Sequence, residues 1–538
     1  MSAVAVPTPD LKSQKYDRQL RLWAATGQTA LESATVCLLG ATSTGCEVLK
    51  NLILPGVGNI TVVDDQLVQE DDIRSNFFLE SSSLNQPKAK CVVELLKELN
   101  EDVKANWTVK APSDMILQEP EFFTPFHTII ASNIHEDDII RLASFCEQTK
   151  KVLIVIRSKG LCGYFRIQAP EHAIIETHPE NVTDLRLNQP FVQLVEYAKK
   201  FDLAKLDQTD HAHVPFVIVI LKYIEDWKAK HDGKLPKTYA ERNELKENIK
   251  AGKRTVDEEN FDEAIANVWR LSSSCEIPSD VRRIFEDPAC QNLTADSEPF
   301  WIIARAIADF VANEGEGQLP LPGKLPDMKS DTNNYIGLQN AYRQKALADL
   351  VIVQSRVHQW LEDLELSRDS IPADTIEGFC KNAAHIKIIR YRSLLDEYVA
   401  KPKTQKIETT LQQDENLAYY IAYRAADRFY SAYQRWPGDR GGDNEEDVQL
   451  LRQQVIATLH NLGLPESTIT TLMQRSDTID KAIINFVRFN NQETPNLAAL
   501  MGGLVSQEVI KLITHQYVPL NNTCVFNGIS STSSVFEL

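Results

Sequence analysis

The chain has 538 residues, a length that allows about two to four domains with large apolar cores. Its formal net charge is −18, from 57 basic and 75 acidic residues, which argues against nucleic acid or an anionic membrane surface as the main partner. Hydrophobic residues make up 43% and charged residues 25% of the chain, which is typical of a soluble globular protein.

Residues 1–14 lack a basic region followed by an apolar core, so we expect no signal peptide. The longest apolar run, residues 214–221, is far shorter than the roughly 20 residues of a membrane span. The nine cysteines are odd in number and form no C-x-x-C pair, which favours neither a disulfide framework nor a zinc site. We therefore expect a cytoplasmic or nuclear protein without a structural metal.

Residues 15–31 have apolar side chains on one helical side, with Arg18 and Arg21 interleaved, and predict a surface helix. From the local pattern alone, both arginines are most simply interpreted as solvated.

Residues 36–65 have the order strand, glycine turn, helix, strand. The first apolar run ends in Gly40, helical spacing begins at Gly45, and the second apolar run ends at Asp64. This is the order of a nucleotide-binding βαβ unit. However, Thr42 stands at the middle position of the G-x-G-x-x-G fingerprint, where its branched side chain would crowd a phosphate. The fold is therefore strongly indicated, and nucleotide binding is not.

Further apolar runs at residues 128–131 and 152–156 flank a helical segment and continue a parallel α/β pattern. Before them, Phe77 and Phe78 are expected to be buried. The pattern predicts an α/β, Rossmann-like domain that is interrupted by a large, mainly α-helical insertion. We assign its first part to residues 1–178, the insertion to residues 179–490 and its C-terminal part to residues 491–538.

Seven segments carry a resemblance to a known family: KYDRQLRLWAATGQ, LKNLILPGVG, NFFLE, ETHPENVTDLRLNQPF, DHAHVPFVIVILKYIEDW, FWIIARAIADFVANEGEGQLPLPGKLPDM and MGGLVSQEVIKLITHQ. They resemble the activating enzymes for ubiquitin-like modifiers, of the ThiF/MoeB-like superfamily, and in particular the regulatory subunits of Nedd-type (Rub-type) activating enzymes. The resemblance runs from about residue 15 to residue 538 and includes the helical insertion.

The resemblance implies a heterodimer in which this chain is an inactive adenylation domain with no cofactor of its own. The catalytic subunit would bind ATP and Mg, adenylate the Nedd-type modifier and hold it as a thioester. The modifier would then pass to a conjugating enzyme and on to cullins. The expected insertion corresponds to the catalytic-cysteine domain of active members, but no segment here resembles their catalytic-cysteine loop.

The family motifs for ATP are incomplete in this chain. Active members carry G-x-G-G-x-G, whereas Thr42 and Ser43 replace the middle glycines here. Active members also place an arginine and a glutamine where this chain has Asn76, Phe77 and Phe78. Neither asparagine nor phenylalanine supplies the cation that phosphate needs.

The family lysine is retained as Lys88, and the acid at the strand end as Asp64 or Asp65. The next expected acid is missing from residues 131–133, which read Ala-Ser-Asn. We therefore predict a degenerate nucleotide site made of Gly40, Thr42, Gly45, Asp64, Asn76, Phe77 and Lys88.

The resemblance gives Arg18 a role of its own. It matches the family arginine that reaches across the dimer to the partner's nucleotide, where a planar and always charged guanidinium would contact phosphate oxygens. The family also pairs through the region that follows the first βαβ helix. On that ground we expect four residues at the partner interface: Pro55, Val57, Leu67 and Val68.

Two other functions stay open. Gly40, Gly45 and Asp64 would suit a self-sufficient Rossmann enzyme such as an oxidoreductase, although Thr42 and the lack of an acid–base cluster oppose it. An adaptor for signalling proteins, with no link to activation, is the third possibility. His211 and His213 flank one alanine, but no third ligand lies nearby in the sequence, so a metal site is not expected.

Overall fold

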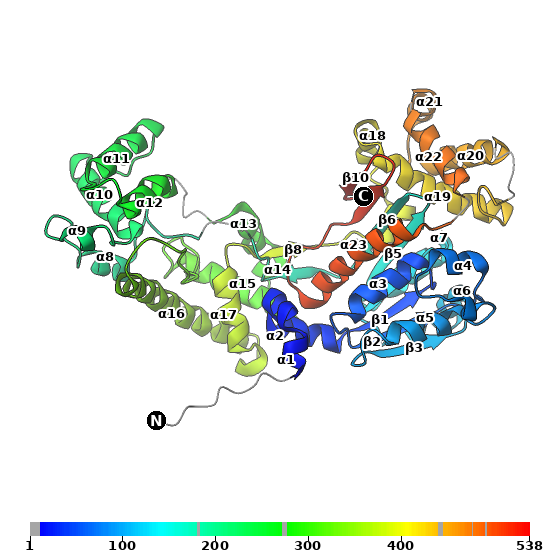
Figure 1. Ribbon diagram of the computed structural model, residues 1–538, viewed down its shortest axis with the longest axis horizontal. Helices are drawn as coiled ribbons and strands as arrows, with labels where there is room; N and C mark the ends of the chain where they lie inside the picture. The colour runs from blue at the N-terminus through cyan, green and yellow to red at the C-terminus, as the bar shows by residue number, and fades with distance from the viewer. Residues whose placement is uncertain (1–10, 180–182, 272–276, 440–444, 476, 490–491) are drawn as a thin grey trace. The chain divides into compact units, whose positions relative to one another are not determined.

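The computed structural model describes residues 11–538 apart from residues 180–182, 272–276, 440–444, 476 and 490–491 (Figure 1). The chain divides into two compact units. Residues 1–172 and 388–538 form the first, here called the α/β unit, and residues 173–387 form the second, here called the helical unit. The short strands β7 (His172–Ile174) and β8 (Lys387–Ile389) lie where the chain passes from one unit to the other.

An eight-stranded sheet forms the centre of the α/β unit, in the order β10-β9-β6-β5-β4-β1-β2-β3. The strands β3, β2, β1, β4 and β5 are parallel, and β6, β9 and β10 continue the sheet in antiparallel fashion. The strand bounds are β1 Thr35–Leu39, β2 Asn59–Val63, β3 Lys104–Thr108, β4 Thr128–Ser132, β5 Val152–Lys159, β6 Cys162–Gln168, β9 Thr523–Asn527 and β10 Thr532–Phe536.

Thirteen α-helices belong to the described part of the α/β unit. They are α1 Leu11–Lys15, α2 Asp17–Ser33, α3 Ser43–Ile53, α4 Glu70–Ser75, α5 Lys88–Lys97, α6 Pro112–Gln118, α7 Glu136–Gln148, α18 Thr404–Gln413, α19 Asn416–Tyr433, α20 Glu445–Asn461, α21 Glu466–Arg475, α22 Asp477–Arg488 and α23 Pro495–Thr514.

Alternating side chains of the sheet divide its core into two layers. Val36 and Leu38 of β1 face one layer, together with α3, α5 and α23. Cys37 and Leu39 of the same strand face the other layer, together with α6, α7 and the helices α19, α20 and α22. Figure 1 shows α23 lying along α3, although the two are far apart in the sequence.

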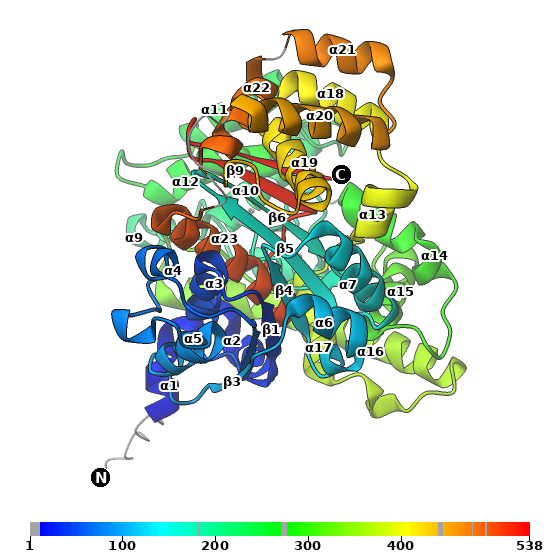
Figure 2. The same ribbon diagram turned by 90° about the vertical axis from the view of Figure 1, so that its right-hand side faces the viewer.

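The boundary of the helical part differs from the expected one. Residues 388–490 were expected in the insertion, but they belong to the α/β unit. The reason is packing, because α19 lies against β9 and against α20 and α22, as Figure 2 shows for these grouped helices. Buried ion pairs add to this contact: Arg157 of β5 pairs with Asp427, and Arg166 of β6 pairs with Glu397 at 2.8 Å.

The helical unit contains ten α-helices among its described residues. They are α8 Val192–Ala198, α9 Gln208–His211, α10 Phe216–Lys230, α11 Tyr239–Ala251, α12 Glu259–Asn267, α13 Ser279–Glu286, α14 Pro288–Gln291, α15 Pro299–Ala312, α16 Thr332–Asp363 and α17 Ala373–Asn382. The core of α8, α10, α11, α12 and α16 includes the apolar run at residues 214–221, which is buried in α10 and the turn before it.

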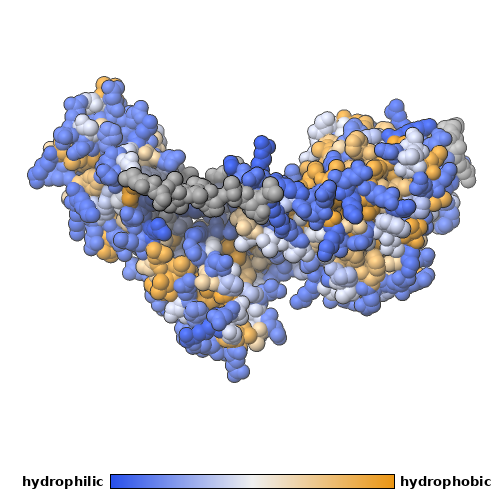
Figure 3. All heavy atoms as spheres, turned by 60° about the horizontal axis from the view of Figure 1, so that its bottom comes forward, coloured by the Kyte–Doolittle hydropathy of each residue, from blue (hydrophilic) through white to orange (hydrophobic). Residues whose placement is uncertain are grey.

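Within the described residues, α23 is long and apolar enough to cross a membrane by composition. Leu497, Met501 and Val505 of this helix are buried against the sheet and α3, so it is a core helix here. Hydrophilic residues predominate on the face drawn in Figure 3, with smaller hydrophobic areas between them.

Candidate functional site

A cleft of about 840 Å³ opens at the carboxyl ends of β1, β2 and β4, beside the first turn of α3. This end of a parallel sheet is where α/β folds bind their ligands. Four of the predicted site residues line the cleft: Gly40, Thr42, Asp64 and Lys88.

The two retained glycines serve the packing of the turn. Gly40 has a φ of +82°, and a Cβ at this position would lie 2.5 Å from the carbonyl oxygen of Ser132. A Cβ at Gly45 would lie 2.8 Å from a methyl carbon of Leu38, so this glycine lets α3 approach β1. Packing within the chain therefore requires both glycines, whether or not the turn binds a phosphate.

Thr42 fills the turn with its side chain. Its Oγ1 accepts a hydrogen bond from the Gly45 N–H at 3.0 Å and lies 2.6 Å from Ser132 Oγ. Thr42 is therefore the N-cap of α3, a role for which a hydroxyl is well suited. A phosphate-binding turn has glycine at this position. In this chain Thr42 occupies it and stabilises the start of α3.

A carboxylate from the far end of the chain lies at the first turn of α3. The backbone N–H of Ser43 donates to Glu493 Oε2 at 2.7 Å, and the N–H of Thr44 points to the same oxygen at 3.4 Å. In nucleotide-binding folds this position belongs to a phosphate. The separation of 450 positions between Ser43 and Glu493 explains why no sequence pattern indicated this contact.

The retained lysine and acid bond within the chain. Lys88 Nζ forms an ion pair with Asp72 Oδ1 at 2.9 Å and donates to Gln66 Oε1 at 2.8 Å. Asp64 accepts from the N–H groups of Ala41 at 2.7 Å and Gln66 at 2.8 Å. Burial raises the pKa of Asp64, while nearby Lys88 acts against that rise. Each oxygen of Asp64, on which the oxidoreductase alternative depended, thus accepts a backbone N–H of the chain itself.

Asn76 and Phe77 do not line the cleft. Asn76 is buried, donates to Cys46 Sγ at 3.3 Å and accepts from the Phe78 N–H at 3.0 Å. The predicted burial of Phe78 is confirmed, but that of Phe77 is wrong, because its side chain is 83% exposed. The turn after α4 thus buries one of the two neighbouring rings and leaves the other exposed.

The lining of the cleft is strongly acidic. Seven carboxylates line it, against the two cationic side chains of Arg74 and Lys88. Arg74 already lies within 3.4 Å of Asp71 and 3.2 Å of Glu70. A polyphosphate would meet a repulsive field at this surface. The seven carboxylates are Asp64, Asp65, Asp71, Asp72, Asp138, Asp439 and Glu493.

Arg18 lies in the first turn of α2 and is exposed. In the described part of the chain, no carboxylate pairs with its guanidinium, whereas Arg21 on the same helix pairs with Asp17 at 2.8 Å. An exposed cation without an internal partner is available to an external anion.

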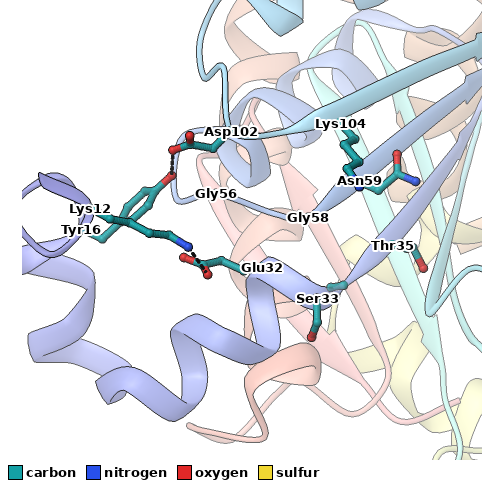
Figure 4. Close-up of a pocket in the computed structure, with 11 residues that line it drawn as sticks. Lys12, Tyr16, Glu32, Ser33, Thr35, Gly56, Gly58, Asn59, Asp102 and Lys104 are labelled. Atoms are coloured by element: carbon teal, nitrogen blue, oxygen red, sulfur yellow. Dashed lines mark hydrogen bonds and ion pairs between the residues drawn. The ribbon is translucent and has the colours of Figure 1, made fainter. Parts of the chain in front are cut away.

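The backbone just before Arg18 is fixed by Tyr16, which is only 2% exposed. Its hydroxyl accepts from Asn100 Nδ2 at 3.1 Å and donates to Asp102 Oδ2 at 3.3 Å. Figure 4 shows the ring directed at Asp102 and Gly56, in the wall of a pocket of about 370 Å³. The segment that carries Arg18 therefore starts from a rigid point.

The predicted interface residues differ in exposure. Pro55, Val57 and Val68 are buried in the core of the α/β unit. Leu67 is 46% exposed and is the one of the four whose side chain is available at the surface of the chain. The other three side chains pack within the chain, and the place of these four residues at a partner interface stays a prediction.

The described cysteines offer no exposed thiol. All eight are buried, and burial raises the pKa of Cys46 and Cys146, for example, to about 12. Cys275 lies outside the described residues. Among the residues described, no group of three or more metal-binding side chains occurs, and His211 Nδ1 lies 2.6 Å from Glu258 Oε1 in a buried pair.

Comparison with known proteins decides the family. The sequence model of the ThiF family matches residues 16–538. The chain belongs to the ThiF family. Within it, the chain is a member of the group formed by the regulatory subunits of NEDD8-activating enzymes, as the following relatives show.

A NEDD8-activating enzyme E1 regulatory subunit of Danio rerio is 39% identical over 536 residues, covering 98% of this chain and 99% of the relative. The regulatory subunit AXR1 of Arabidopsis thaliana is 38% identical over 537 residues, covering 99% and 97%. The Saccharomyces cerevisiae relative is 26% identical over 542 residues, covering 98% and 100%. Each match includes both the α/β unit and the helical unit.

The fold of this ThiF-family chain is Rossmann-like α/β with a helical insertion, as predicted. Among solved structures, a crystal structure of PaaA aligns with a TM-score of 0.27 and 14% identity, covering 31% of this chain and 54% of that chain. A likeness of this size carries no argument about function.

Proposed function

We propose that this chain is the regulatory, non-catalytic subunit of a heterodimeric activating enzyme for a NEDD8-type ubiquitin-like modifier. The catalytic subunit binds ATP and Mg, adenylates the modifier and takes it as a thioester on its own cysteine. A conjugating enzyme then receives the modifier for attachment to cullins in the cytoplasm or nucleus. The observation that carries the proposal is the identity of 38–39% over nearly the full length to regulatory subunits of animals and plants.

The geometry of the cleft supports a non-catalytic role. The helix terminus that would hold a phosphate bonds to Glu493, and the lysine that would contact one is paired with Asp72. The surrounding carboxylates oppose a bound triphosphate. ATP chemistry is therefore assigned to the catalytic subunit and not to this chain.

Arg18 is the residue that this chain contributes to the reaction in trans. It is exposed, stands on a helix whose start is fixed by Tyr16, and has no carboxylate partner in the described chain. A guanidinium delivered to the partner's nucleotide would stabilise charge on phosphate oxygens as adenylation proceeds. The rest of the chain acts as the scaffold that places this cation and pairs with the catalytic subunit.

ATP–pyrophosphate exchange in the presence of the modifier tests the proposal. The purified chain, the catalytic subunit and the mixture of both are compared, and rapid exchange is expected only from the mixture. Exchange catalysed by this chain alone would contradict its non-catalytic role. Failure of the two chains to co-elute at equal stoichiometry would contradict the heterodimer and would favour an adaptor function instead.

A further inference from the structure

The helix α2 is bent sharply a few residues after Arg18. Within Asp17–Ser33, Trp23 has a φ of −127° and a ψ of 18°, and Ala24 has a φ of +55° and a ψ of −176°, so two helical parts meet at these residues. A residue with a Cβ rarely adopts the backbone conformation of Ala24, whereas glycine adopts it without strain. The bend is therefore imposed by the surrounding contacts and not by the preference of the residue itself.

The part of α2 before the bend, residues 17–22 and here called the arm, carries Arg18. None of the six residues of the arm, all of which the structure describes, is buried, whereas the part after the bend contains three buried residues. The direction of the arm is therefore set mainly at its two ends. Just before the first end lies Tyr16, which is buried and donates its hydroxyl hydrogen to Asp102 (Figure 4).

The second end of the arm is the bend, which distant parts of the chain hold in place. The carbonyl oxygen of Trp23 accepts a hydrogen bond from Gln516 Nε2 at 2.9 Å, and its indole N–H donates to Gln28 Oε1 at 3.1 Å. Gln28 is buried and also donates to the carbonyl oxygen of Pro55 at 3.0 Å. A Cβ at Gly27 would lie 2.8 Å from the Cβ of Trp23, so this glycine lets the Trp23 side chain lie close against the helix. These contacts tie the bend to the segments that follow α3 and α23.

We propose that the bend at Trp23 and Ala24 directs Arg18 toward the nucleotide of the catalytic subunit, and that both are positioning residues for adenylation. A straight α2 would carry Arg18 along the axis of its buried part. The bend turns the arm away from that axis and leaves the guanidinium exposed. Backbone strain of this kind persists where the surrounding structure requires one conformation. The inference rests on the proposed role of Arg18 in trans and adds two residues that act through its position.

Pyrophosphate exchange by the reconstituted enzyme tests the inference. Ala24→Val should slow exchange by roughly tenfold, because a β-branched side chain opposes a positive φ and the arm shifts. Ala24 is exposed, so the added methyl groups disrupt no packing, and co-elution of the two subunits should be unchanged. A wild-type rate for this variant would overturn the proposal.

Ala25→Val is the matched control. Ala25 is the next residue, is also exposed and has helical backbone angles, so the same side chain adds no strain there. This variant should exchange pyrophosphate at the wild-type rate. Equal slowing by the two valine variants would show an effect of bulk and not of the bend, and would overturn the proposal.

The double variant Arg18→Ala, Ala24→Val separates positioning from a general loss of structure. If the bend acts through Arg18, the valine should not slow exchange further once the guanidinium is gone. Losses that multiply in the double variant would overturn the proposal. Ala24→Gly provides the rescue, because glycine keeps the bent backbone without strain and should retain the wild-type rate. A loss of rate as large as that of Ala24→Val would contradict the inference.

Trp23→Phe is a second variant in case Ala24→Val fails to fold. It keeps an aromatic ring beside Gly27 but removes the N–H that donates to Gln28, so it should slow exchange in the wild-type background and not in the Arg18→Ala background. An unchanged rate in the wild-type background would overturn the role of the bend. Arg18→Ala alone distinguishes the two failures. Slow exchange by Arg18→Ala together with wild-type rates for the bend variants refutes only this inference, whereas a wild-type rate for Arg18→Ala also refutes the role in trans.

Discussion

The side-chain amide of Asn100 donates a hydrogen bond to the hydroxyl of Tyr16 at 3.1 Å, and it thereby joins the start of α2 to the loop before β3. The same amide group donates to the carbonyl oxygen of Ile53 at 2.8 Å. Lys15 adds contacts to Asn100 at 2.6 Å and to Asp102 at 2.7 Å. The backbone before Arg18 is thus held by several independent bonds, while the Arg18 side chain itself stays exposed.

Replacement of Arg18 by alanine should slow modifier adenylation in the reconstituted enzyme by roughly a hundredfold, since a charge-stabilising donor at the transition state is lost. Co-elution of the two subunits should be unchanged. Arg21→Ala is the matched control, because Arg21 lies on the same helix and pairs with Asp17. Pyrophosphate exchange measures the rate, and equal rates for wild type and Arg18→Ala would remove the role in trans.

Gly56→Ala should lower the midpoint of thermal unfolding. Gly56 has a φ of +90°, and a Cβ there would lie 2.7 Å from the Tyr16 hydroxyl, so the substitution adds a clash to the strain of the left-handed backbone. Gly233→Ala isolates the strain, since Gly233 has a φ of +77° with nothing within 4 Å of the added carbon. The Gly56 variant should lose more stability, by roughly 1–3 kcal/mol. Equal losses would show that the close contact with the Tyr16 hydroxyl adds no destabilisation beyond the backbone strain.

Asp427→Ala should destabilise the α/β unit strongly. Asp427 of α19 pairs with Arg157 of β5, and both side chains are buried. An uncompensated buried guanidinium costs about 3–5 kcal/mol. Glu70→Ala, which breaks an exposed pair with Arg74, should change stability by about 1 kcal/mol or less. Chemical denaturation measures both losses, and comparable effects would contradict the burial of the Arg157 pair.

Acidification should weaken the fold through His172. Burial lowers the pKa of His172 from 6.5 to about 3, and nearby His515 acts in the same direction. In the unfolded chain His172 therefore binds a proton near pH 6.5, whereas in the folded chain it stays neutral until the pH is near 3. The contribution of neutral His172 to the free energy of unfolding is fully present above pH 6.5 and is lost as the pH falls toward 3. At pH 5 the loss is roughly 2 kcal/mol.

His172→Phe removes this proton-binding difference, and its unfolding midpoint should fall less between pH 7.5 and pH 5 than that of the wild type. His213→Phe, which replaces an exposed histidine, is the control. A wild-type pH dependence in the His172 variant would show that other groups are responsible. Thermal unfolding at a series of pH values provides the measurement.

Much of the α/β unit could be predicted from local patterns. The run from β1 to β2 has a periodicity and a glycine turn that are properties of neighbouring residues, so the order strand, turn, helix, strand was predicted correctly. The helix begins at Ser43, two residues before the expected Gly45, because Thr42 caps it. The strand β3 was not predicted, because it is an edge strand whose side chains, such as Trp107 at 43% exposure, form no apolar run. The opposite exposures of Phe77 and Phe78 likewise depend on the path of the turn and not on residue type.

The sequence by itself determined the family and the damage to the phosphate turn, since both depend on residue types at fixed short spacings. Only the tertiary structure decided what fills the cradle, which helices cover the sheet and which residues remain available to a partner. Glu493 reaches α3 from 450 residues away, residues 388–490 pack with the α/β unit, and Val57 is buried. Such contacts are chosen by the packing of the whole chain, which local side-chain patterns do not encode.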